Sequence, residues 1–134
     1  MWMPTMKFQT PGGVPFEIPD DWWHFAEMKD FHPSAGSYYP YSEPKWGSVQ
    51  IISLSEIEPL QRSPGTPLFR KYKLVPVLLA FASPECALPP VELNPLGAGS
   101  RYRYKVHNGC HRYYGSIAAG YRDLPAVVFE PFAG

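Results

Sequence analysis

Proline restricts the folds open to this chain more than any other residue, because 17 of its 134 residues are prolines. Proline lacks a backbone N–H and interrupts helices and the inner strands of sheets. We therefore expect short helices and strands joined by frequent turns. The length suits one domain with a single core, and 45% apolar against 18% charged residues is a globular composition.

The charge balance argues against some classes of partner. The 12 basic and 12 acidic side chains cancel, whereas a domain that grips nucleic-acid backbone carries a marked basic excess. No apolar run approaches the roughly 20 residues that span a bilayer, and the first residues lack the order of a secretory signal. Two cysteines, Cys86 and Cys110, indicate no disulfide framework. We expect a cytoplasmic protein without a membrane partner.

The N-terminal part predicts a hairpin followed by an aromatic arm. Residues 6–18 hold two short apolar runs around a Pro-Gly-Gly turn. Pro19 and two acids then precede the aromatic run 22–25, which predicts a short helix that packs the arm onto the core. Residues 30–47 show no period and predict irregular chain. We treat residues 1–48 as this hairpin and arm.

From residue 49 to residue 134 the pattern predicts a second unit of mixed α+β fold, because strand-like and helix-like stretches alternate. Strands are predicted at 49–52, 88–93, 101–107 and 124–130, and the last helix should end at Gly120.

A helix is predicted from Leu68 onward, with Pro76 expected to kink or split it. Apolar residues at helical spacing indicate one buried face. Its expected members are Leu68, Tyr72, Val75, Leu79 and Ala82.

The sequence HNGCHR, between a predicted strand and the last helix, holds most of the candidate chemistry. Asn108 is a favoured helix cap, and Gly109 lets the backbone approach a ligand. The first amides of a helix point outward as unpaired donors, so the turn is a candidate phosphate site. Arg112 would add a two-pronged clamp and His111 a further donor, and the same field would favour the thiolate of Cys110. A cysteine and a histidine that only pack in the core would give the same letters.

Residues 102–130, which contain this turn and a final strand entered by Leu-Pro, resemble the ParB/sulfiredoxin superfamily. The order of the upstream elements also fits, so the resemblance covers about residues 49–130. It implies a small α+β fold that binds a nucleotide of the ATP, ADP or CTP type, with Mg²⁺, against a Gly-x-His-Arg turn.

The resemblance also implies roles for single residues. Sulfiredoxins carry Gly-Cys-His-Arg and use ATP to reduce a cysteine sulfinic acid on peroxiredoxins. The same four letters stand here, which makes Cys110 the implied nucleophile and makes His111 and Arg112 the implied phosphate holders. The lysine of the family's first helix corresponds to Lys71 or Lys73, and both assignments stay open.

Two other branches of the superfamily imply further residues. In ParB partition proteins an arginine ahead of the first helix lies on the phosphates, which implies Arg62. Those proteins continue into a helix-turn-helix region, whereas this chain stops at Gly134, so we expect no sequence-specific DNA binding. A third branch phosphorylates small molecules with an acid as base, and Glu56 and Glu58 lie in the corresponding connection.

Our leading hypothesis is a nucleotide-binding protein that acts as a phosphotransferase or hydrolase on a small-molecule or protein acceptor. Ser116, one turn beyond Arg112, is expected to line the pocket. One alternative is a sulfinic acid reductase that uses Cys110. Another is a non-catalytic interaction module whose aromatic arm forms a partner or homodimer surface. No metal site of the protein's own is indicated, since the four histidines and two cysteines lack ligand spacing.

Overall fold

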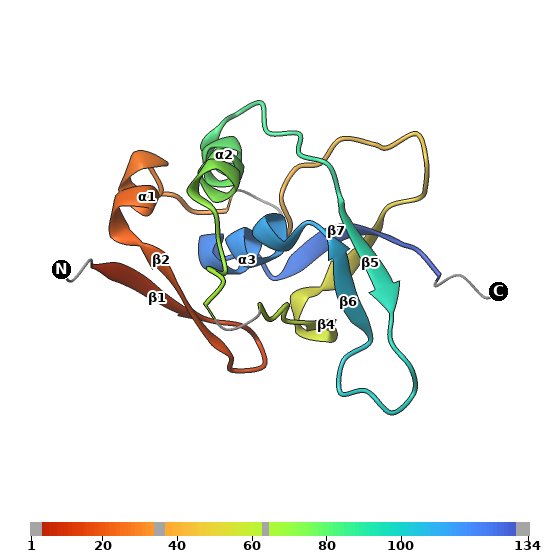
Figure 1. The fold of residues 1–134 in the computed structure, drawn as a ribbon. Helices are drawn as coiled ribbons and strands as arrows, with labels where there is room; N and C mark the ends of the chain where they lie inside the picture. The colour runs from red at the N-terminus through yellow and green to blue at the C-terminus, as the bar shows by residue number, and fades with distance from the viewer. Residues whose placement is uncertain (1–3, 34–36, 63–64, 131–134) are drawn as a thin grey trace.

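The computed structural model describes residues 4–33, 37–62 and 65–130, and it confirms the predicted α+β fold. A hairpin lies at one end of the molecule and a five-stranded sheet at the other, with helix α3 between them (Figure 1). The hairpin pairs β1 (Thr5–Gln9) with β2 (Pro15–Pro19) in antiparallel register, close to the predicted range.

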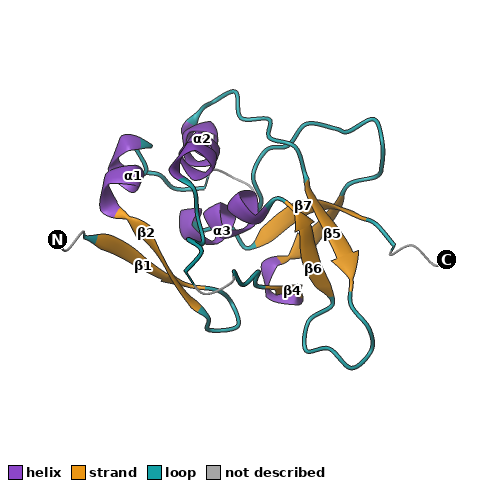
Figure 2. Cartoon of the chain, in the orientation of Figure 1, coloured by secondary structure: helices purple, strands orange, loops and turns teal. Residues whose placement is uncertain are grey.

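The larger sheet has the strand order β3-β7-β5-β6-β4 and mixes parallel and antiparallel neighbours. Its strands are β3 (Gln50–Ser53), β4 (Ile57–Glu58), β5 (Val91–Pro95), β6 (Tyr104–Asn108) and β7 (Asp123–Val128). The helices are α1 (Asp20–Phe25), α2 (Lys71–Ala82) and α3 (Cys110–Ala119). Figure 2 shows α3 between the hairpin and the sheet, with α2 above it; the two helices pack on each other. No described helix combines the length and the hydropathy that a membrane-spanning segment needs.

Helix α2 runs through Pro76 without a break, so the predicted split is wrong. The predicted buried face is also wrong in part, because Tyr72 is 70% exposed and Leu79 is 39% exposed. The residues that α2 buries are Leu74, Val75, Leu78 and Phe81. Both sets recur at three- and four-residue spacing, so periodicity cannot choose between them. The observed set is the one that packs on α3, where a Cβ on Gly115 would lie 3.5 Å from Phe81 and 3.8 Å from Leu74.

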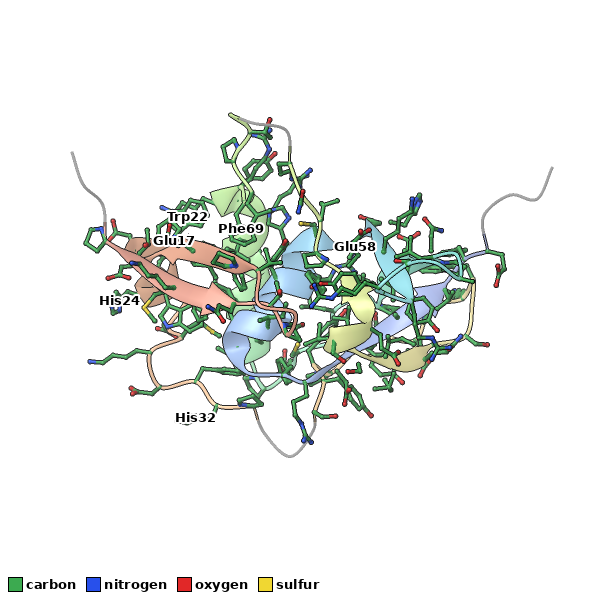
Figure 3. The ribbon with its side chains drawn as sticks, turned by 90° about the horizontal axis from the view of Figure 1, so that it is seen from below. Glu17, Trp22, His24, His32, Glu58 and Phe69 are labelled. Atoms are coloured by element: carbon green, nitrogen blue, oxygen red, sulfur yellow. The ribbon has the colours of Figure 1, made fainter. Side chains whose placement is uncertain are left out.

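The hairpin and the aromatic arm join the core of the sheet and helices. Phe16 is 5% exposed, and its ring centroid lies 4.9 Å from that of Tyr114 and 6.0 Å from that of Phe69. Figure 3 shows Phe69 beside the hairpin. Trp23 is buried as predicted for the arm, whereas Phe25 is 64% exposed. The division of the chain at residue 48 stays a prediction, and residues 1–3, 34–36, 63–64 and 131–134 of its two parts lie outside the described residues.

We predict that Phe16→Ala lowers the free energy of unfolding by about 3 to 5 kcal/mol. The substitution leaves a cavity where the Phe16 ring packs on Tyr114 of α3 and on Phe69, which precedes α2. Denaturant unfolding measures this value. The matched control is Phe25→Ala, which removes the same side chain from the surface and should cost no more than about 0.5 kcal/mol. Equal, small losses in both variants would show that the hairpin does not share the core.

Candidate functional site

The turn from β6 into α3 leaves three backbone amides pointing out of the helix. Gly109 is the N-cap, with φ 118° and ψ 28°, in the region that favours glycine. A Cβ there would lie 3.0 Å from both methyl carbons of Val91. The first helical bond runs from the Tyr113 amide to the Gly109 carbonyl at 2.9 Å, so the amides of residues 110, 111 and 112 precede it. No side chain among the described residues caps them.

Asn108 does not cap the helix, contrary to the sequence prediction. Its Nδ2 donates instead to Oε2 of Glu92 on β5, at 2.7 Å. The cap falls one residue later, at Gly109, whose φ of 118° is a conformation that favours glycine. The side chain of Asn108 therefore ties β6 to β5, while the helical amides stay available.

An open cavity of about 560 Å³ lies at these amides. Its size is that of a small-molecule site. The cationic side chains along it are Arg62, Lys73 and Arg112, and no described lining residue is Asp or Glu. The cavity is therefore lined by one sign of charge together with the positive end of the α3 dipole, which favours an anion.

Two tyrosines of α3 position the connection that carries Arg62. Tyr114 Oη donates to the Leu60 carbonyl at 2.8 Å, and Tyr113 Oη lies 3.4 Å from the Ile57 carbonyl. Both hydroxyls satisfy backbone acceptors while their rings pack in the core. The sequence analysis did not predict a role for these residues. The available signal was two consecutive tyrosines one turn into a helix, because a tyrosine ring can pack in the core while its hydroxyl makes a hydrogen bond.

The structure distinguishes the two lysines that the sequence left open. Lys73 lines the cavity. Lys71 points elsewhere, with its Nζ 5.6 Å from the ring centroid of Phe25 on α1. Residues two apart on a helix do not share a face, so only one of the two can reach the α3 turn.

His111 is held as a neutral imidazole. Its Nε2 accepts the Arg70 amide at 3.1 Å, which assigns the ring proton to Nδ1. The pKa of His111 is lowered to about 4, chiefly by burial and in addition by the nearby charges of Lys73, Arg62 and Arg70. At neutral pH the side chain adds an N–H donor to the site without adding charge.

Cys110 is 8% exposed, and burial raises the pKa of its thiol, with Arg62 opposing the rise only in part. This direction is opposite to the thiolate expected from the sequence. Desolvation disfavours the charged form more than the neighbouring guanidinium favours it.

Arg112 lines the cavity but also bonds to the protein itself. Its Nη1 donates to the carbonyls of Pro89 and Pro90 at 2.8 and 2.9 Å, and Tyr39 Oη donates to the Pro89 carbonyl at 2.6 Å.

Ser116 is fully buried and does not line the cavity, and its Oγ has no partner among the described residues. The structure therefore places Ser116 in the core and not at the candidate site.

The candidate acids lie outside the cavity lining. Glu56 pairs with Arg103 at 3.5 Å, and Glu58 is exposed in a neighbouring groove. Within residues 4–33, 37–62 and 65–130, no group of three or more His, Cys, Asp or Glu side chains is placed to hold a metal ion.

No protein-family model matches the sequence, and no curated protein matches it. Among solved structures, the chain is similar to the C-terminally truncated chromosome-partitioning protein ParB from Caulobacter crescentus, complexed with CTP-gamma-S. The TM-score is 0.47 and the sequence identity is 20%. The match covers 65% of this chain and 47% of the ParB chain, so it spans about half of that protein's length.

We predict that Gly109→Ala costs about 2 to 4 kcal/mol of unfolding free energy, because it combines a disfavoured φ with a Cβ pressed against Val91. The measurement is denaturant unfolding. Gly97→Ala is the matched control, since its Cβ meets no atom within 4 Å and its φ is not positive. It should change stability by no more than about 0.5 kcal/mol. Two equal effects would contradict the strained cap.

The low pKa of His111 predicts a pH dependence of stability. The folded value is about 4 and the ordinary value is 6.5, so the unfolded chain binds the proton first as pH falls. This group should leave stability unchanged above pH 6.5 and lower it between 6.5 and 4. His111→Gln keeps an acceptor for the Arg70 amide but does not titrate. Between these pH values wild type should lose about 1 kcal/mol more than the variant, once solvent screening of this half-buried ring is allowed for. Parallel pH profiles would contradict the assignment.

Proposed function

We propose that this chain binds the phosphate groups of a nucleotide at the N-terminus of α3. The observation that carries the proposal is the meeting of three kinds of donor in one cavity. These are the unpaired amides of the first helical turn, the cations Arg62 and Lys73, and the neutral His111 N–H. Phosphate oxygens are acceptors only, and each of these groups can donate to them.

A neighbouring groove supports a ligand larger than phosphate. It has a volume of about 430 Å³ and shares Leu60 and Val106 with the cavity. Pro59, Gln61 and Tyr102 also line it, so it offers apolar surface, an amide and an aromatic ring. A nucleoside could lie there while its phosphates contact α3.

The proposal is one of binding and assigns no chemical step. Phosphoryl transfer needs a base and a means of holding a cation, and the described cavity lining contains no carboxylate for either task. Sulfinic acid reduction needs a reactive thiolate, whereas burial holds Cys110 in its protonated form. The resemblance in four letters of the turn thus supports phosphate binding better than it supports either reaction.

Calorimetry with ATP, ADP and CTP, each with and without Mg²⁺, tests the proposal. Lys73→Ala should weaken binding of the preferred nucleotide roughly 10- to 100-fold, because it removes a charged donor from the cavity. Lys71→Ala is the matched control from the same helix turn. It removes the same charge outside the cavity and should change affinity by no more than about twofold.

Two results would overturn the proposal. One is the absence of binding by any of the three nucleotides to the folded wild-type chain. The other is an equal loss of affinity in Lys73→Ala and Lys71→Ala, which would indicate general attraction to the protein's charge and no site at α3.

A further inference from the structure

Strand β3 forms an edge of the five-stranded sheet and lies in an uncharged stretch. Residues 46–55, WGSVQIISLS, contain no charged residue and no proline. Ile51, in the middle of this stretch, is 41% exposed, and Trp46 at its start is 51% exposed. Edges of this kind can pair with a strand of another chain.

The hydrogen-bond phase of β3 shows which backbone groups face the open edge. The Leu54 amide donates to the Arg122 carbonyl at 3.0 Å, and the register pairs Ile52 with Leu124. Because bonded and non-bonded pairs alternate in an antiparallel ladder, Ile52 bonds to β7 and Ile51 faces away from it. The N–H and C=O of Ile51 have no partner among the described residues.

The other edges carry features that discourage such pairing. In the hairpin, β2 begins and ends with proline and holds Glu17, while β1 holds Lys7. At the far edge of the large sheet, β4 has two residues and is followed by Pro59. Charges, prolines and short length are the usual protections of an edge, and β3 lacks the first two.

We propose that β3 is a dimer interface, in which a second copy of this chain pairs with it in antiparallel fashion about a twofold axis at Ile51. This pairing joins the outward backbone groups of Ile51 in the two copies and extends the sheet across both molecules. The strand pairs with itself without like charges meeting. About an axis at Ile51, Gln50 of one copy lies opposite Ile52 of the other, so the two paired strands are complementary in register and carry no charge. This surface is separate from the aromatic arm, whose Trp23 is buried.

Sedimentation velocity of the full chain, from about 10 µM to about 1 mM, should show dimer forming as concentration rises. Ile51→Lys sets two like charges opposite each other and should weaken association by at least about tenfold. Leu79→Lys is the matched control, since Leu79 is 39% exposed on α2, and it should dimerise as wild type does. Thermal unfolding checks that both variants are folded.

Hydrogen exchange at low and high concentration gives an independent reading on wild type. The Ile51 amide should be protected only at high concentration, while the Ile52 amide, bonded to β7, should be protected at both. A chain that stays monomeric over the whole range overturns the proposal. So does a dimer that Ile51→Lys leaves intact, or one that forms without protecting the Ile51 amide.

Discussion

The left-handed turn at Gly109 is the constraint on which the candidate site depends. It lets β6 pass directly into α3 with no capping side chain from the described residues, so the first helical amides stay available as donors. The same turn lies against Val91, so a side chain at position 109 would meet the methyl carbons of Val91. With α3 in this direction, Tyr113 and Tyr114 bond to carbonyls of the segment 57–60, and Arg62, which follows that segment, lines the cavity. One backbone conformation thus aligns the donors of two distant segments.

Local signals predicted much of the fold. The hairpin, the short first helix and the end of α3 at Gly120 depend on turn and cap residues, whose effect is confined to a few neighbours in sequence. The α2 face and β4 were not predicted. Each depends on the neighbouring element. The buried face of α2 is the one that packs on Gly115 of α3, and the two-residue strand β4 is a strand because it pairs with β6.

The sequence predicts where the candidate site lies better than it predicts which side chains form it. Residues 109–112 are adjacent in sequence, so the motif alone indicated the turn. Which lysine reaches it depends on the rotation of α2, and the ionisation of Cys110 and His111 depends on burial. The rotation of α2 and the burial of these side chains both depend on residues that are distant in sequence. The absence of Asp and Glu from the described lining likewise emerges only when three separate segments, 60–62, 73–77 and 106–112, meet.

The bonds of Arg112 carry a consequence for how this protein tolerates its prolines. Continuing the register from Val91 and Ala126 sets Pro90 opposite Pro125, so neither residue has an N–H to give where β5 and β7 begin to run together. The Arg112 guanidinium supplies donors to the carbonyls of Pro89 and Pro90 at that junction. It works there as a substitute for missing strand amides. Removing it would loosen the sheet and the candidate cavity together, so a substitution of Arg112 would test neither of them alone.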